Sequence, residues 1–174
     1  MFKLSYLVRG FPGHPLHPPL TDATIGAYTA ATVLGILAFA GVSEENLTKA
    51  WWLGLLVGLG STALTATTGL IDWLTITWRT PLWWTATWHM LSMLSATGLF
   101  ALAAAFGHDR YVGGHMGGAT FAATLLGFCA LTLGGWLGGT VVFVHGMRVL
   151  NLVEEPAGRA IAPGHPEKEM AERG

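Results

Sequence analysis

Four long apolar runs alternate with short polar turns along the 174 residues of this chain. The runs cover about residues 20–42, 51–74, 83–106 and 118–149. Each is long enough for an α-helix to cross a hydrocarbon core of roughly 30 Å, which takes about 20 residues. The pattern predicts an all-α fold, an integral membrane four-helix bundle. A proline-rich entry segment (1–19) precedes the bundle (20–150), and a flexible polar tail (151–174) follows it.

Composition supports the membrane class. Hydrophobic residues make up 52% of the chain and charged residues only 11%, with a mean hydropathy of +0.50. A soluble domain carries roughly a quarter charged residues, so this chain has too little charge to cover a water-facing surface. The partner expected from composition is therefore the lipid bilayer. The net charge of −1 argues against nucleic acid as a partner.

The distribution of Lys and Arg predicts the orientation. With four spans both termini lie on one side of the membrane, together with the turn between the second and third spans. That side carries Lys3, Arg9, Arg79, Arg148, Arg159, Lys168 and Arg173, whereas the opposite side carries only Lys49 and Arg110. Because positive charge collects on the cytoplasmic side, both termini are expected to be cytoplasmic.

Small residues recur at helical spacing in the second and fourth runs. Gly54 and Gly58 lie four residues apart, as do Gly134 and Gly138. Such seams let helices approach closely in lipid, and they would serve packing within the chain or a homo-oligomer. A likeness between residues 64–70 and 131–137 suggests duplicated hairpins.

Four histidines are expected at the cytoplasmic end. His14 and His17 lie in the stretch Gly13–Asp22, where three prolines favour extended backbone, and Thr21 or Asp22 is placed to cap the first helix. His89 is expected about 10 Å inside the third span at 1.5 Å per residue, and His145 near the end of the fourth. The other three, in the opposite loop and the tail, are excluded: His108, His115 and His165.

Helical periodicity predicts that His89 and His145 point into the bundle. His89 shares a face with Thr85 and Ser92, and His145 is in line with Gly138 and Val141. An ionisable side chain inside a membrane span indicates function. The alternative for each is an internal hydrogen bond to a hydroxyl or a carbonyl group.

Two carboxylates belong to the same predicted layer. Asp22 and Asp72 could each accept a hydrogen bond from the free N–H of a ligand histidine. The structural alternatives are a helix cap for Asp22 and an ion pair with Arg79 for Asp72.

Several separated motifs resemble one family. They are Gly13-His14-Pro15-Leu16-His17-Pro18, Gly69-Leu70-Ile71-Asp72-Trp73, His89, and Gly135-Trp136-Leu137-Gly138-Gly139 with His145-Gly146. Over about residues 10–150 the chain resembles a bacterial family of four-span membrane proteins classed as domain-of-unknown-function 2231. Members joined to Rieske-type iron–sulphur or c-type cytochrome domains imply work near membrane electron transfer. The resemblance also implies a bacterial inner (plasma) membrane. Thr140 stands where members often carry a further histidine.

Two classes of function follow. The first is a b-type haem protein in which His89 and His145 bind the haem iron, with His14 or His17 as alternates or a second site. The second is a subunit without a cofactor that docks or stabilises a redox protein or respiratory complex. A transition-metal site on the same histidines is a third option. No serine or cysteine has an evident base and orienting partner, so an electron carrier or accessory subunit is favoured over a stand-alone enzyme.

Overall fold

The structure, a computed structural model, describes residues 6–11, 13–150 and 152–161. Most of the predicted flexible tail (151–174), including His165, lies outside these residues. The described chain opens with a short helix, α1 (Tyr6–Arg9), and a two-stranded antiparallel hairpin, β1 (Gly10–Phe11) and β2 (His14–Pro15). In that hairpin Gly10 pairs with Pro15 and Phe11 with His14.

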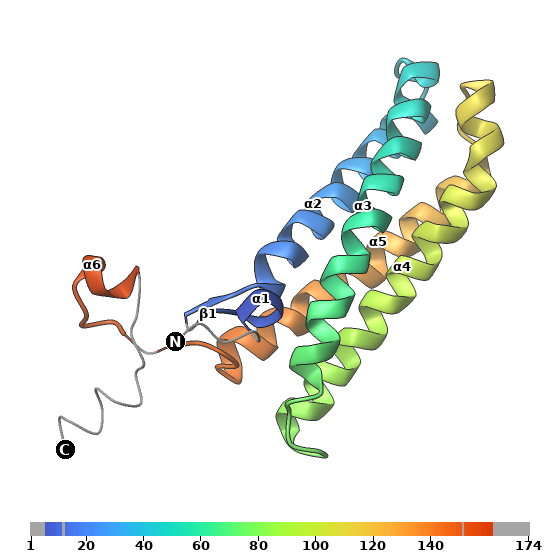
Figure 1. Cartoon of the computed structure of the whole chain (residues 1–174). Coiled ribbons are helices and arrows are strands. Elements are labelled where there is room, and N and C mark those ends of the chain that lie inside the picture. Colours follow the sequence, from blue (N-terminus) through green and yellow to red (C-terminus); the bar gives the residue numbers. More distant parts are fainter. Residues whose placement is uncertain (1–5, 12, 151, 162–174) are drawn as a thin grey trace, which may run out of the picture.

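Four long helices form the body of the molecule (Figure 1). They are α2 (His17–Phe39), α3 (Glu44–Trp73), α4 (Pro81–Gly113) and α5 (Gly118–Gly139), which continues as one π-helical turn, η1 (Thr140–Val144). All four are long and apolar enough to cross a membrane. A last short helix, α6 (Ala157–Ala160), lies beyond them. The predicted all-α membrane bundle is confirmed, and the protein is an integral membrane protein.

The first long helix begins earlier than the sequence suggested. His17 opens α2, and Pro18 and Pro19 occupy its first turn, where the missing N–H groups need no partner. Neither Thr21 nor Asp22 caps the helix, and the Thr21 hydroxyl donates instead to the His17 carbonyl oxygen at 3.0 Å. The prediction that both histidines lie on extended backbone is therefore right for His14 and wrong for His17.

The two halves of the bundle repeat each other. The ring of Tyr28 on α2 lies against Gly58 on α3, and the ring of Phe100 on α4 lies against Gly127 on α5. Tyr28 and Phe100 in turn stack on each other, with centroids 4.2 Å apart and planes 11° from parallel. A Gly–Tyr–Phe–Gly stack thus crosses the bundle and joins the α2–α3 hairpin to the α4–α5 hairpin.

The repeat has a fixed register along each helix. Equivalent residues of α2 and α4 are 72 positions apart, as with Tyr28 and Phe100, and those of α3 and α5 are 69 apart, as with Gly58 and Gly127. The likeness between residues 64–70 and 131–137 pointed to a duplication but aligned the hairpins two residues out of register. Because α2 and α4 run in the same direction (Figure 1), the hairpins are parallel repeats about an axis along the bundle.

The beginning and the end of the described chain lie at one end of the bundle (Figure 1). The turn from α3 to α4 lies at this end too, whereas the α2–α3 and α4–α5 turns lie at the other. Glu45 in the first turn of α3 and Glu154 after η1 therefore stand at opposite ends, and both are exposed.

This arrangement makes the predicted orientation testable. We expect Glu45→Cys to react with a membrane-impermeant maleimide on intact spheroplasts, and Glu154→Cys to react only after lysis, because Lys and Arg are concentrated at the Glu154 end. Both changes are made in a Cys129→Ala background, since Cys129 is exposed. The reverse labelling pattern would show the opposite orientation, and labelling of both sites would contradict four spans.

Candidate functional site

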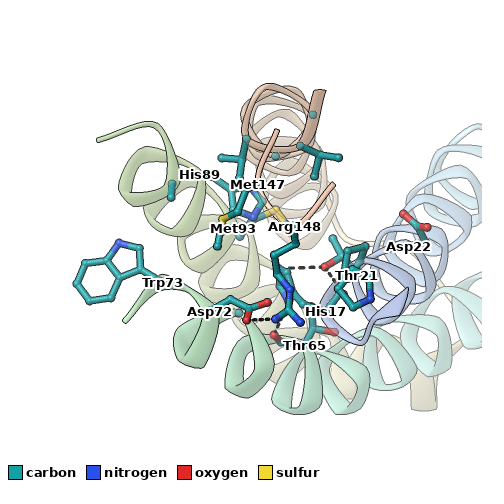
Figure 2. Close-up of a pocket in the computed structure, with 18 of the residues that line it drawn as sticks. His17, Thr21, Asp22, Thr65, Asp72, Trp73, His89, Met93, Met147 and Arg148 are labelled. Carbon is teal, nitrogen blue, oxygen red and sulfur yellow. Dashed lines mark hydrogen bonds and ion pairs between the residues drawn. The ribbon is translucent and has the colours of Figure 1, made fainter. Parts of the chain in front are cut away.

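A cavity of about 1020 Å³ lies between the two hairpins, at the end of the bundle where the described chain begins (Figure 2). All four long helices line it, and the segment after η1 passes along it with residues 147–150, 152 and 153. Most lining side chains are apolar, or absent at glycine. The volume is at the upper end of the roughly 300–1,000 Å³ typical of small-molecule sites.

His17 enters this cavity from the first turn of α2. Its Nδ1 is 3.0 Å from the Thr65 carbonyl oxygen and 3.3 Å from the Thr68 hydroxyl oxygen. A carbonyl oxygen only accepts hydrogen bonds, so Nδ1 carries the proton and Nε2 keeps its lone pair. Among the described residues Nε2 has one hydrogen-bond contact, a long one of 3.4 Å to the Thr21 hydroxyl, and that hydroxyl also donates to the His17 carbonyl oxygen at 3.0 Å. The ring is thus held in one tautomer with the other nitrogen available to a ligand.

His89 enters the cavity from α4 in the same way. Its Nδ1 is 2.8 Å from the carbonyl oxygen of Gly134 on α5, so here too Nδ1 is the donor. Among the described residues Nε2 of His89 has no hydrogen-bond partner. The hydroxyl or carbonyl bond expected for a purely structural histidine is present, but it uses only one nitrogen of the ring.

The two histidines are equivalent under the repeat. They lie 72 residues apart, and their carbonyl partners, Thr65 and Gly134, lie 69 apart. Four residues further along each helix a glycine faces the ring. A Cβ built on Gly69 would lie 2.6 Å from Cε1 of His17, and one on Gly138 would lie 2.9 Å from Cε1 of His89. Each imidazole ring therefore occupies the space that any side chain larger than that of glycine would fill at Gly69 or Gly138.

A charged cluster lies at the mouth of the cavity, where Asp72 and Arg148 are among the lining residues. The carboxylate of Asp72 accepts a hydrogen bond from Nη1 of Arg148 at 2.5 Å and lies 3.4 Å from Nε of Arg9. Arg148 also donates from Nη2 to the Arg9 carbonyl oxygen at 2.7 Å. The predicted partner of Asp72 was Arg79, and this is wrong: Asp72 joins the segments before α2 and after η1 to the end of α3.

The other predicted site residues make no hydrogen bond to the ring of His17 or His89 among the described residues. His14 is exposed on β2, and Asp22 is exposed on α2, where it lines the cavity away from Arg148 (Figure 2). Nε2 of His145 is 3.0 Å from the hydroxyl oxygen of Thr85, and His145 does not line the cavity. The structure thus brings together His17 and His89, and not the expected pair of His89 and His145.

The π-helical turn explains the position of His145. Its backbone N–H bonds to the carbonyl oxygen of Thr140, five residues earlier, so the turn holds one residue more than an α-helical turn. One extra residue rotates everything after it by about 100° relative to an unbroken α-helix. The face calculated from Gly138 and Val141 therefore does not apply to His145.

Residues 13–151 match the model of a family described as a predicted membrane protein of unknown function, DUF2231. The chain belongs to this family. The match spans both hairpins and includes every residue of the site except Arg9. The family description of this DUF2231 protein states no activity. No curated protein and no solved structure gave a match.

Sequence reasoning missed four contributors to the site. Gly69 and Gly138 were noted only as small or motif residues, and Arg9 and Arg148 only as markers of orientation. Their roles depend on contacts between residues 49 to 139 positions apart in the sequence. For the two glycines the available signal was the spacing in the sequence, since His17 and His89 are 72 residues apart and Gly69 and Gly138 are 69 apart.

Proposed function

We propose that the protein binds haem b in this cavity, where Nε2 of His17 and Nε2 of His89 would hold the iron, and carries electrons in or beside a membrane electron-transfer chain. One observation carries the proposal: two equivalent histidines, one from each hairpin, line a single large cavity and use Nδ1 for backbone carbonyls. A carbonyl partner on the far nitrogen is typical of metal-bound histidine, where it fixes the tautomer and raises the basicity of the ligand.

The donor set favours haem over a bare metal ion. Within the described residues no group of three or more His, Cys, Asp or Glu side chains could hold a metal. A porphyrin supplies four nitrogen ligands of its own, so iron needs only two more from the protein. His17 and His89 would supply those two ligands, one from each hairpin.

The remainder of the site suits an electron carrier. The glycines that face the rings let the two imidazoles pack closely against α3 and α5, and the mostly apolar walls of the cavity suit a large flat group. When bound, the haem would supply the one-electron chemistry, and the chain would hold the iron through two neutral imidazoles. A redox protein or respiratory complex is the partner that such a carrier requires, in the bacterial inner membrane with both termini cytoplasmic.

A copper site is the second candidate. Figure 2 places Met93 and Met147 beside His89 at the cavity wall. Thioether and imidazole ligands suit Cu(I), and they would not require a porphyrin-sized space. A subunit without any cofactor, associating through its glycine seams with a redox complex or its own copies, is the remaining alternative.

The test is the absorption spectrum of protein purified in mild detergent from haem-replete cells. We expect a Soret band and, after reduction, the α band of a six-coordinate haem, because two imidazoles bind the iron. Any colourless fraction should take up haemin to a ratio of one per chain. Colourless protein that does not respond to haemin would reject the proposal, and metal analysis of the same sample would then test for copper.

A further inference from the structure

The cluster at the cavity mouth carries more positive than negative charge. Its three described side chains are two guanidinium groups, of Arg9 and Arg148, and one carboxylate, of Asp72. The Asp72 side chain is 9% exposed and that of Arg148 is 22% exposed, while Arg9 at 37% is more open to solvent. In partly buried surroundings a surplus charge is screened weakly, so the cluster attracts an anion.

Arg148 has donors left over for an anion. Guanidinium has five N–H groups, and the contacts to Asp72 and to the Arg9 carbonyl use one hydrogen on each of Nη1 and Nη2. Asp72 thus holds the guanidinium in place without saturating it. The fork geometry of the free donors matches a carboxylate or a phosphate.

The backbone from η1 to Arg148 has a conformation that places Arg148 at the mouth of the cavity. Arg148 has φ of +60°, in the left-handed region that non-glycine residues rarely adopt, and Gly146 has φ of +67°. With the π-helical turn before it, the chain bends back along the cavity and not away from the bundle. Unfavourable backbone of this kind persists when the surrounding contacts hold it, and such positions cluster at ligand sites.

The chemical groups that line the cavity therefore differ between its interior and its mouth. The Thr65 carbonyl that holds His17 precedes Asp72 by seven residues on α3, about 10 Å along the helix axis. The interior offers imidazoles and apolar walls, and the mouth offers guanidinium groups. A flat apolar molecule with carboxylates along one edge fits this gradient, and haem b is such a molecule.

We propose that Arg148 and Arg9 bind the carboxylates of the haem, with Asp72 as the positioning residue for both. This inference rests on the proposed function. The acidic edge of the haem then faces the membrane surface at the termini, and its apolar edge faces the bundle interior. The arginines thus set the orientation of the haem in the cavity and contribute affinity that is independent of the iron ligands.

The experiment compares haemin with its dimethyl ester, which has the same iron and macrocycle but no carboxylates. Both are titrated by absorbance into colourless protein in neutral detergent. We expect the wild type to bind the free acid about tenfold more tightly or better, as charge-assisted hydrogen bonds allow. Arg148→Gln should bring this ratio close to one while leaving the ester affinity unchanged, which shows that the variant is folded. Arg9→Gln should give a smaller loss because its side chain is more exposed.

Arg79→Gln is the matched control, because Arg79 lies in the α3–α4 turn at the same end of the bundle but outside the cluster, and it should retain the full ratio. Equal affinity of the wild type for acid and ester would overturn the proposal, as would an equal loss for both ligands in Arg148→Gln. Loss of the acid preference on adding anionic phospholipid would assign the arginines to lipid headgroups and also overturn it. Failure of both porphyrins to bind would instead reject the haem site itself.

Discussion

Changing either His17 or His89 to alanine will abolish the six-coordinate haem spectrum of the purified protein, whereas changing His145 to alanine will leave it in place. Each of the first two variants removes one of only two protein bonds to the iron. His145 bonds to Thr85 outside the cavity, so its loss should not affect the ligand field. The measurement is the reduced-minus-oxidised difference spectrum at matched protein concentration.

Two further variants make this comparison decisive. His14→Ala on β2 and His108→Ala near the opposite end of the bundle should both resemble the wild type. Free imidazole added to His89→Ala should restore part of the spectrum, because the variant leaves a space of matching shape. A spectrum that is lost in His145→Ala and kept in His17→Ala would restore the pair of His89 and His145 expected from helical periodicity.

Introducing leucine at Gly58 will destabilise the bundle strongly, whereas leucine at Gly60 will not. A Cβ at Gly58 would lie 2.5 Å from ring carbons of Tyr28. Tyr28 is 1% exposed and has Phe100 stacked on its other face, with Gly127 behind Phe100. Neither ring can move away, so we expect the free energy of unfolding to fall by about 1–3 kcal/mol or more, as for other overpacked cores.

Gly60 is a control on the same helix. It is exposed, and no atom lies within 4 Å of a Cβ built there. Leucine at Gly60 should leave stability unchanged or raise it slightly, since glycine weakens a helix interior. Thermal unfolding in detergent, followed by near-ultraviolet circular dichroism, compares the two variants. Equal melting temperatures would show that the ring stack does not hold the hairpins together.

The sequence was enough to predict the four spans and the end of the bundle that carries the site. An apolar run of more than 20 residues crosses a bilayer as a helix, and once those spans were fixed His17, His89 and Asp72 had to lie toward the same end of the bundle. The pairing of the histidines was not predictable in this way. It depended on the π-helical turn at Thr140–Val144 and on a helix that starts at His17 in spite of two prolines.

The charged cluster was beyond sequence reasoning for a different reason. Arg79 is the arginine nearest to Asp72 in sequence, and the turn between α3 and α4 made it the natural partner. The true partners lie 63 and 76 residues away. They reach Asp72 because the segments before α2 and after η1 come together at the same end of the bundle (Figure 1). The pattern of residues around Asp72 in the sequence does not indicate this contact.

The repeat of the two hairpins has an evolutionary consequence. A single ancestral hairpin that dimerised with its own copy would already have offered one histidine from each subunit to a shared ligand. Duplication and fusion of its gene would keep that arrangement and free each half to diverge. Divergence is visible at Asp72, whose equivalent in η1 is Val141, and at Tyr28, whose equivalent on α4 is Phe100. A symmetric dimer would carry its charges in duplicate at the mouth, whereas the fused chain has Asp72 in the first hairpin and Val141 at the equivalent place in the second, so the two halves of the mouth differ.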